Sequence, residues 1–136
     1  MSYGVAFALQ SGVFAAVSGD SAVQALIGSQ VYDAVPQGSL PQTYVVIGEE
    51  RVRDRSDVSA RGALHDFTVS VFSDAAGFAA AKQVAAAVSD RLVDADLALT
   101  RGHLVSLRFV KARALRGKSP DGRRIDLSFR ARVEDI

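Results

Sequence analysis

Apolar residues recur at helical spacing at the start of the chain. Between residues 4 and 17 they lie three or four positions apart, and Phe7 and Phe14 widen the same stripe. A period of 3.6 residues with one apolar stripe is typical of an amphipathic helix. We therefore expect a first helix here, with both phenylalanines on its apolar face.

A second, shorter helix is predicted directly afterwards. Asp20 is a suitable N-cap for a helix over residues 21–27, because its carboxylate can accept hydrogen bonds from the free amides of the first turn. Gly28 can end this helix, since glycine adopts a left-handed conformation without strain. The turn residues in VPQGSLPQ interrupt regular structure beyond it.

Two strands are predicted next, and they form one long hairpin. Residues 43–47 are a β-branched and aromatic run that continues into the charged segment EERVRDRSD, where the strand leaves the core. Beyond the turn-like segment SARG, the residues Phe67, Val69 and Val71 alternate with polar residues. This alternation is typical of a half-buried antiparallel strand.

A third helix is predicted to run from Asp74, as its N-cap, to about Leu92. Its apolar residues share one face at helical spacing: Phe78, Ala81, Ala85, Val88 and Leu92. Because alanine is small, a face so rich in alanine suits close packing against a sheet.

The last segment predicts a second hairpin, with strands over residues 104–115 and 125–133 around the turn sequence GKSPDGR. In its second strand an apolar set faces one way and a polar set the other: Ile125, Leu127, Phe129, Ala131 and Val133 against Arg124, Asp126, Ser128, Arg130 and Arg132. In the first strand the apolar phase slips by one residue, from Val105, Leu107 and Phe109 to Val110, Ala112 and Ala114. A β-bulge near Phe109 and Val110 explains the slip and turns Lys111 and Arg113 to the outer face.

These elements predict an α+β fold in the order ααββαββ, in which an antiparallel sheet of two long hairpins carries helices packed on one face. The chain has 136 residues, with no linker and no internal repeat, so we expect residues 1–136 to form a single domain. The N-terminal segment lacks positive charge, and no apolar run reaches the length of a membrane span. Neither a signal peptide nor a membrane span is therefore expected.

Composition excludes several kinds of site. The chain has no cysteine, which excludes disulfides, thiolate zinc sites, iron–sulfur clusters and a cysteine nucleophile, and which fits cytoplasmic synthesis. No serine lies in a G-x-S-x-G frame, so the usual nucleophile turn of a serine hydrolase is missing. An enzyme is therefore not expected.

Three weaker motifs favour structural interpretations. The GKS sequence at 117–119 lacks the first glycine of a phosphate-binding loop and is followed by a proline, so it indicates a hairpin turn. His65 and Asp66 are adjacent on a strand and point to opposite faces, and the other histidine is His103, so we expect surface or edge positions rather than a metal site. Asp94 and Asp96 could hold a cation weakly, but solvated turn carboxylates are much more common. No cofactor or metal is predicted.

Charge is distributed unevenly along the chain, although the net charge is only +1. Residues 1–50 contain no Lys or Arg and four acids, whereas residues 101–136 contain ten basic residues against four acidic ones. Arginine outnumbers lysine thirteen to three. A GC-rich genome would produce this bias, and so would interfaces that use bidentate guanidinium pairs with carboxylates or phosphates. Both explanations stay open.

Several segments together resemble a known family. They are VYDAVPQG with LPQTYVVIGE, the stretch VFSDAAGFAAAK, and the terminal hairpin with its DG turn. In this order, and from about Leu9 to Glu134, the chain resembles the DUF3168 family of tail-completion or tail-terminator proteins of long-tailed phages and gene transfer agents.

The resemblance implies a structural, non-enzymatic virion protein. Members of this family assemble as a hexameric ring between the tail tube protein and the head-side connector or stopper protein, and DNA passes through the lumen without sequence preference. Such a protein would be assembled in the bacterial cytoplasm and would lie in the tail or neck region of the virion. The family offers no catalytic residues and no cofactor.

Charged residues are the candidates for the subunit interface. The segment RVRDRSD alternates in sign, as suits a protruding hairpin that pairs with a neighbour. The arginines of the terminal hairpin can likewise meet acids of the first third, among them Asp20 and Asp33. The predicted interface residues are Arg51, Arg53, Arg55, Asp57, Glu49, Glu50, Arg124, Arg130 and Arg132.

The alternative is a small, nonspecific nucleic-acid-binding module. The basic terminal segment supports it, but the basic strands lack interleaved exposed aromatic residues and match no known readout motif. A module should bind DNA as a monomer, whereas a tail terminator should form rings or bind tail proteins.

Overall fold

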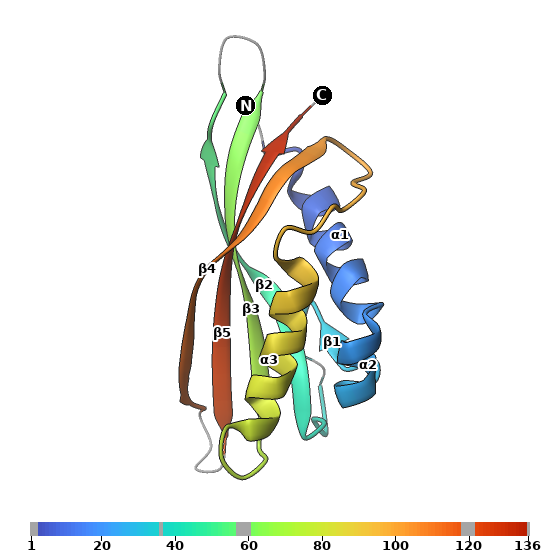
Figure 1. Ribbon diagram of the computed structural model, residues 1–136, viewed down its shortest axis with the longest axis vertical. Coiled ribbons are helices and arrows are strands. Elements are labelled where there is room, and N and C mark those ends of the chain that lie inside the picture. The colour runs from blue at the N-terminus through green and yellow to red at the C-terminus, as the bar shows by residue number, and fades with distance from the viewer. Residues whose placement is uncertain (1–2, 36, 57–60, 118–121, 136) are drawn as a thin grey trace.

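The computed structural model describes residues 3–35, 37–56, 61–117 and 122–135. Its elements, in chain order, are α1 (Ala6–Ser18), α2 (Ser21–Ile27), β1 (Val31–Tyr32), β2 (Thr43–Asp54), β3 (Gly62–Ser73), α3 (Ala79–Leu92), β4 (His103–Arg116) and β5 (Arg123–Glu134). The helices lie on one side of a strongly twisted sheet (Figure 1). The predicted α+β class is confirmed. We call the helix-covered side of the sheet its inner face and the opposite side its outer face.

The sheet is mixed rather than purely antiparallel. Its strand order is β1-β2-β3-β5-β4, and the hairpin pairs β2–β3 and β4–β5 are antiparallel as predicted. The short strand β1, however, runs parallel to β2, with Val31 opposite Val45. The sequence prediction missed β1 because two residues cannot display a period-two pattern.

Helix α1 buries a narrower face than its apolar stripe predicts. Leu9, Val13 and Val17 are almost fully buried, but Phe7 is 80% exposed. Phe14 is partly buried against the core. The expectation that both phenylalanines share the buried face is therefore wrong for Phe7, because its side of the helix meets no part of the sheet.

Helix α2 is capped as predicted. The carboxylate of Asp20 accepts a hydrogen bond of 3.1 Å from the amide of Val23, which satisfies one of the free donors at the helix start. Gly28 ends the helix with φ +61° and ψ −128°, a conformation that a residue with a Cβ atom rarely adopts.

Helix α3 starts later than predicted, and Asp74 does not cap it. The helix begins at Ala79, and its N-cap residue Phe78 makes no side-chain capping bond. Asp74 instead remains next to the end of β3, where its amide donates to the carbonyl of Gln42. A loop that contains Gly77 at φ +69° then leads into the helix. The predicted buried face of α3 is confirmed apart from Phe78, which is partly buried.

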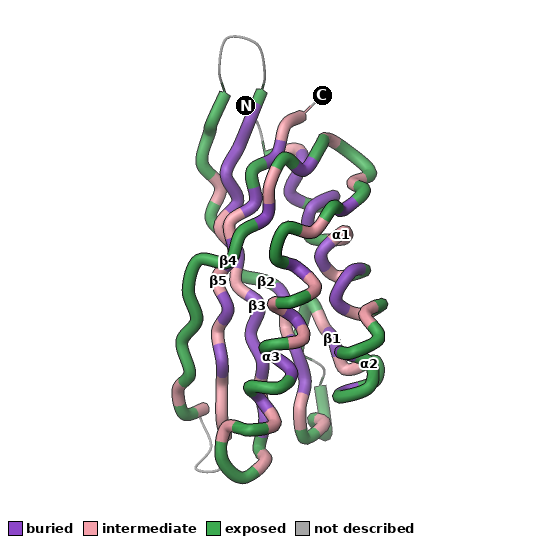
Figure 2. Tube along the Cα trace, viewed as in Figure 1, coloured by how far each residue is buried: buried purple, intermediate pink, exposed green. Residues whose placement is uncertain are grey.

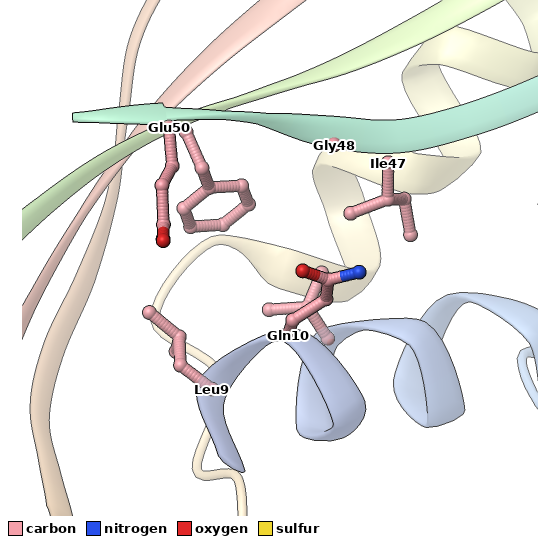
Figure 3. Close-up of a pocket in the computed structure, with 7 residues that line it drawn as sticks. Leu9, Gln10, Ile47, Gly48 and Glu50 are labelled. Atoms are coloured by element: carbon pink, nitrogen blue, oxygen red, sulfur yellow. The ribbon is translucent and has the colours of Figure 1, made fainter. Parts of the chain in front are cut away.

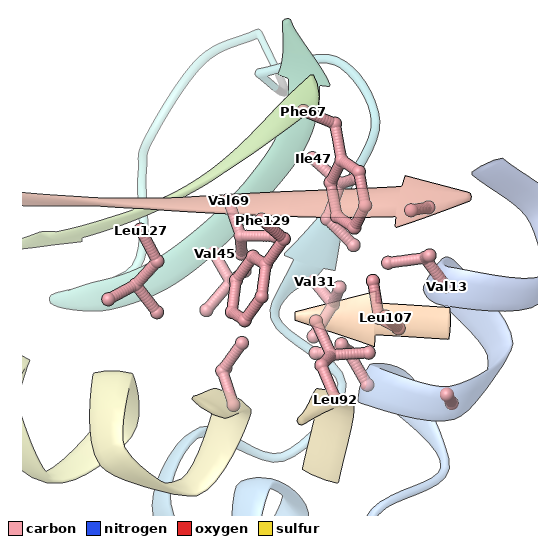
Figure 4. Packing of buried hydrophobic residues seen from close by; sticks show 14 of the residues in the cluster. Val13, Val31, Val45, Ile47, Phe67, Val69, Leu92, Leu107, Leu127 and Phe129 are labelled. Atoms are coloured by element: carbon pink, nitrogen blue, oxygen red, sulfur yellow. The ribbon is translucent and has the colours of Figure 1, made fainter. Parts of the chain in front are cut away.

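The core lies between the helices and the inner face of the sheet (Figure 4). Its centre is Phe129 of β5, which is fully buried. The Phe129 ring stacks on Phe67 at 5.6 Å and meets Phe109 edge-on at 6.0 Å. The alternation predicted for β5 is confirmed, since all five of its apolar residues are buried and the residues between them are not.

Strand β4 carries the predicted bulge. Its register against β5 shifts between Phe109 and Lys111, and a second shift lies between Leu104 and Ser106. Because of this second irregularity, Leu104 is buried instead of Val105, which is 45% exposed.

None of the helices in the described part of the chain has the length and the apolar character that a membrane-spanning helix needs.

The ending of α2 can be tested with a matched pair of glycine substitutions. Gly28→Ala should destabilise the protein by about 1–3 kcal/mol, because alanine must adopt an unfavourable backbone conformation there although no atom lies within 4 Å of the added Cβ. Gly48→Ala is the control, since its added Cβ would lie 3.9 Å from the nearest atom and its φ is not positive. Urea unfolding measures both variants. Equal midpoints would contradict the assigned role of Gly28.

Candidate functional site

The charged hairpin predicted from RVRDRSD is present. Strands β2 and β3 pair as far as Asp54 and Ala63 at one end of the sheet, where Gly62 also pairs with Glu134 of β5 (Figure 1). Arg51, Arg53 and Arg55 are exposed there. Asp57, the further predicted interface residue of this hairpin, lies outside the described residues.

A bulge in β2 separates two neighbouring carboxylates. The register between β2 and β3 shifts between Ile47 and Glu50, so Gly48 and Glu49 have no partner residue on β3. Glu49 is exposed, whereas Glu50 points toward α1, above Leu9 (Figure 3). Strict alternation from the buried Ile47 would turn Glu49 inward and Glu50 outward, so the bulge is what places Glu50 on the inner face.

Glu50 binds groups of its own chain. Its Oε2 atom lies 3.2 Å from Nδ1 of the fully buried His65, and its Oε1 atom accepts a hydrogen bond from the hydroxyl of Tyr3. The hydrogen bond and the negative charge of Glu50 raise the pKa of Tyr3. Because Glu50 already has these two partners, its carboxylate is not free for a neighbouring subunit.

The outer face carries ion pairs, both between neighbouring strands and within β5. Arg130 of β5 donates through Nε to Asp66 of β3 at 2.7 Å, and Arg53 of β2 lies 3.5 Å from the same carboxylate. Arg124 donates to Asp126 at 2.8 Å, and the guanidinium of Arg124 also lies 5.1 Å from the centre of the Phe72 ring. The hydrogen bond to Asp66 raises the pKa of Arg130. These three predicted interface arginines therefore have partners in their own chain.

Other predicted interface residues have no such partner. Among the described residues, no ion pair or side-chain hydrogen bond involves Glu49, Arg51, Arg55 or Arg132, and all four are exposed. They lie on β2, just beyond its end, and on β5. Within the described part of the predicted set, these four side chains combine exposure with the lack of a partner in the chain.

The two bulges border one groove on the outer face. The groove is open, encloses about 570 Å³, and runs from Glu49 and Arg51 on β2 to Val110 and Lys111 on β4. Asp66, Thr68, Ser128 and Arg130 contribute to its lining. Its lining carries both charge signs and hydroxyl groups, which suits polar contacts with a protein surface better than a small apolar ligand.

The remaining sequence candidates are dispersed. His65 and Asp66 point to opposite faces as predicted, but His65 is fully buried rather than at the surface or an edge, because β3 is a central strand under the helices. Asp94 adopts φ +56°, and its amide donates to the carbonyl of Leu107. Among the described residues, no three His, Asp or Glu side chains gather as metal ligands do. The GKS motif falls largely outside the described residues.

Both the sequence and the fold are similar to those of known proteins. The sequence profile of a family described as "Tail completion protein gp17" matches residues 11–134. A chain in a solved structure titled "Virion of native gene transfer agent (GTA) particle" is 58% identical, with a TM-score of 0.93. This match covers 98% of the present chain and 99% of that chain. No curated protein matches the sequence.

The different surroundings of Glu49 and Glu50 predict different effects on stability. Glu50→Ala should destabilise the fold by about 1–3 kcal/mol, because it removes the hydrogen-bond partner of the buried His65. In the part of the chain that the structure describes, the Nε2 atom of His65 has no hydrogen-bond partner that could compensate. Glu49→Ala should change stability by less than about 0.5 kcal/mol, as expected for an exposed residue without partners. Urea unfolding decides, and equal losses would contradict this assignment.

Proposed function

The chain belongs to the tail completion protein gp17 family, whose members are structural proteins of phage tails, and on that premise we propose that it is a tail-terminator subunit. Copies of the chain form a closed ring, of six subunits, between the tail tube and the head-side connector of a long-tailed phage or gene transfer agent. The ring is a structural part of the virion neck and performs no catalysis.

The observation that carries this proposal is the similarity to the gene transfer agent chain. It extends over 98% of the present chain at 58% identity. The similarity therefore includes residues at the surface as well as residues of the core. Proteins so similar over their whole length bury and expose the same positions. The virion setting of that chain therefore supports a virion setting for this one.

A ring also suits the distribution of the exposed charges. Strands β2 and β4 lie toward opposite edges of the sheet. The four predicted interface residues without a described partner therefore fall into two groups. Glu49, Arg51 and Arg55 belong to the β2 side, and Arg132 belongs to the β4–β5 side. Head-to-tail association joins unlike surfaces. It closes into a ring when a whole number of equal rotations from one copy to the next makes a full turn.

Nonspecific attraction of DNA is the second candidate role for these cations. The outer face bears more basic than acidic side chains, and DNA that passes through a ring would meet such a face by phosphate contacts alone. The ion pairs of Arg124 and Arg130 favour the subunit interface, however, because they neutralise part of this charge within the chain.

The ring itself is tested by native mass spectrometry of the purified chain and by cryo-electron microscopy of purified particles. We expect six copies in one layer at the neck, between tail tube and connector. A protein that is absent from the neck, or present there as a single copy, would refute the proposed function.

The unpartnered cations provide the test of the interface residues. Replacing Arg51, Arg55 and Arg132 together with Ala should change the free energy of unfolding by less than about 0.5 kcal/mol per site, because these side chains are exposed and have no partner among the described residues. Ring or tail assembly should fall instead. The control replaces Lys82 and Arg91 of α3 with Ala.

Two results would count against this interface. One is normal assembly with slower DNA passage and weaker, salt-dependent DNA binding, which would assign the three arginines to the lumen. The other is equal loss of assembly in the α3 control.

A further inference from the structure

Strand β4 is exposed on both of its faces over half of its length. All seven residues from Arg108 to Ala114 are exposed (Figure 2). On the inner face these include Phe109, 44% exposed, and the small residues Ala112 and Ala114. Val110, at the bulge, is 47% exposed. A strand that leaves apolar side chains uncovered on the core side of a sheet lacks a packing partner.

The position of α3 explains this exposure. The helix covers β3 and β5, and the lower half of β4 extends past it at the side of the molecule (Figure 1). Among the described residues, β5 is the one strand that pairs with β4. On the other edge of β4 the carbonyl of Leu107 accepts a hydrogen bond from the amide of Asp94, but beyond Leu107 the exposed residues 108–114 pair with no described strand on that edge. Long open edges of this kind promote association unless another molecule covers them.

The exposed half of β4 is basic. It carries Arg108, Lys111 and Arg113, with Arg116 at its end, and the whole strand contains no acidic residue. Among the described residues none of these four cations has an ion pair or side-chain hydrogen bond. A partner that covers β4 must therefore supply both apolar contact and negative charge.

The opposite edge of the same chain has these two properties. It is built from α2, β1 and the segment after β1, within the first 50 residues, which contain no Lys or Arg. Asp33 is exposed directly after β1, and its carbonyl oxygen lies beside Gly48 of β2. Leu26, Val35 and Leu40 are 45–50% exposed in the same part of the chain.

The sheet register puts the two surfaces at one level. One row of paired residues crosses all five strands, from Tyr32 through Val46, Ser70 and Asp126 to Arg113. Asp33 follows Tyr32, and Arg113 ends the row at the other edge. In a ring, the copies are related by rotation about one axis, so the same atom lies at the same position along that axis in every copy. If the strands run along the axis, Asp33 of one copy meets the level of Arg113 of the next.

We propose that the exposed half of β4 is the docking surface for the α2–β1 edge of a second copy of this chain. The proposal rests on the ring of the proposed function and names the surfaces that join its subunits. Head-to-tail contact pairs the basic strand with the acidic edge, whereas β4 against β4 would oppose like charges. Closure of the ring then covers the open edge of every copy.

Cysteine cross-linking tests the contact directly, because the natural chain has no cysteine. The variant carrying both Arg113→Cys and Asp33→Cys is treated with a short bismaleimide, as purified rings and in particles. We expect a ladder of covalent multimers that ends at the ring size. The single variant Arg113→Cys should give no dimer. The control pair, Lys82→Cys with Asp33→Cys, should give no ladder, since Lys82 lies on the exposed side of α3.

Charge reversal supplies an independent measurement. Arg113→Glu should weaken ring formation about tenfold or more, and Asp33→Arg in the same chain should restore most of it, since both charges are exchanged across the contact. Lys82→Glu is the matched control and should assemble normally.

The outcomes separate this proposal from the function on which it rests. The docking surface is refuted, and the ring is left intact, if rings form normally but the cross-linking results differ from those expected. Such results are cross-links between two copies of position 113, no cross-links between positions 33 and 113, or a ladder from the control pair. Normal assembly of Arg113→Glu with weaker DNA binding alone refutes it as well and assigns β4 to DNA. A chain that stays monomeric in solution and in particles refutes the ring itself.

Discussion

The packing of helices on one face of a twisted sheet is the interaction on which the rest of the structure depends. Phe129 lies at its centre, fully buried between Phe67 and Phe109. In β5 this burial goes with an apolar residue at every second position, and the residues between them face outward. The outer face, with its arginines and carboxylates, is therefore a direct consequence of the core. The helical layer is also narrower than the sheet, which leaves β4 uncovered.

Chain order and strand order together turn a charge gradient in the sequence into a charge difference across the molecule. The acidic first third forms α1, α2, β1 and the first part of β2, and the basic last third forms β4 and β5. Because the strand order is β1-β2-β3-β5-β4, these two parts lie at opposite edges. A monomer with complementary edges that are too far apart to meet each other is suited to head-to-tail association. The fold thus connects a property of the sequence to the ring of the proposed function.

Bulges decide which charged residues belong to the surface. Without the shift in β2, strict alternation from the buried Ile47 would turn Glu49 inward and Glu50 outward. With the shift, Glu50 joins His65 beneath α1, and Glu49 is exposed on the other side. In β4 the corresponding shift at Val110 keeps Ala112 and Ala114 on the inner face and turns Lys111 and Arg113 outward. Both edges of the sheet are shaped in this way.

The sequence by itself determined the features that depend on local periodicity and on single residue types. The α2 cap at Asp20, the glycine ending at Gly28, the alternation of β5 and the bulge in β4 were all predictable, because neighbouring residues carry the whole signal. The family resemblance was also visible, since it depends on several motifs in a fixed order. Tertiary structure alone decided the exposure of Phe7, the late start of α3, the parallel strand β1 and the burial of His65. It also decided that Arg124 and Arg130 have partners within the chain, whereas Arg132 has none among the described residues. These features depend on which element lies across from a residue, and elements meet through contacts between segments far apart in the sequence, which no local pattern encodes.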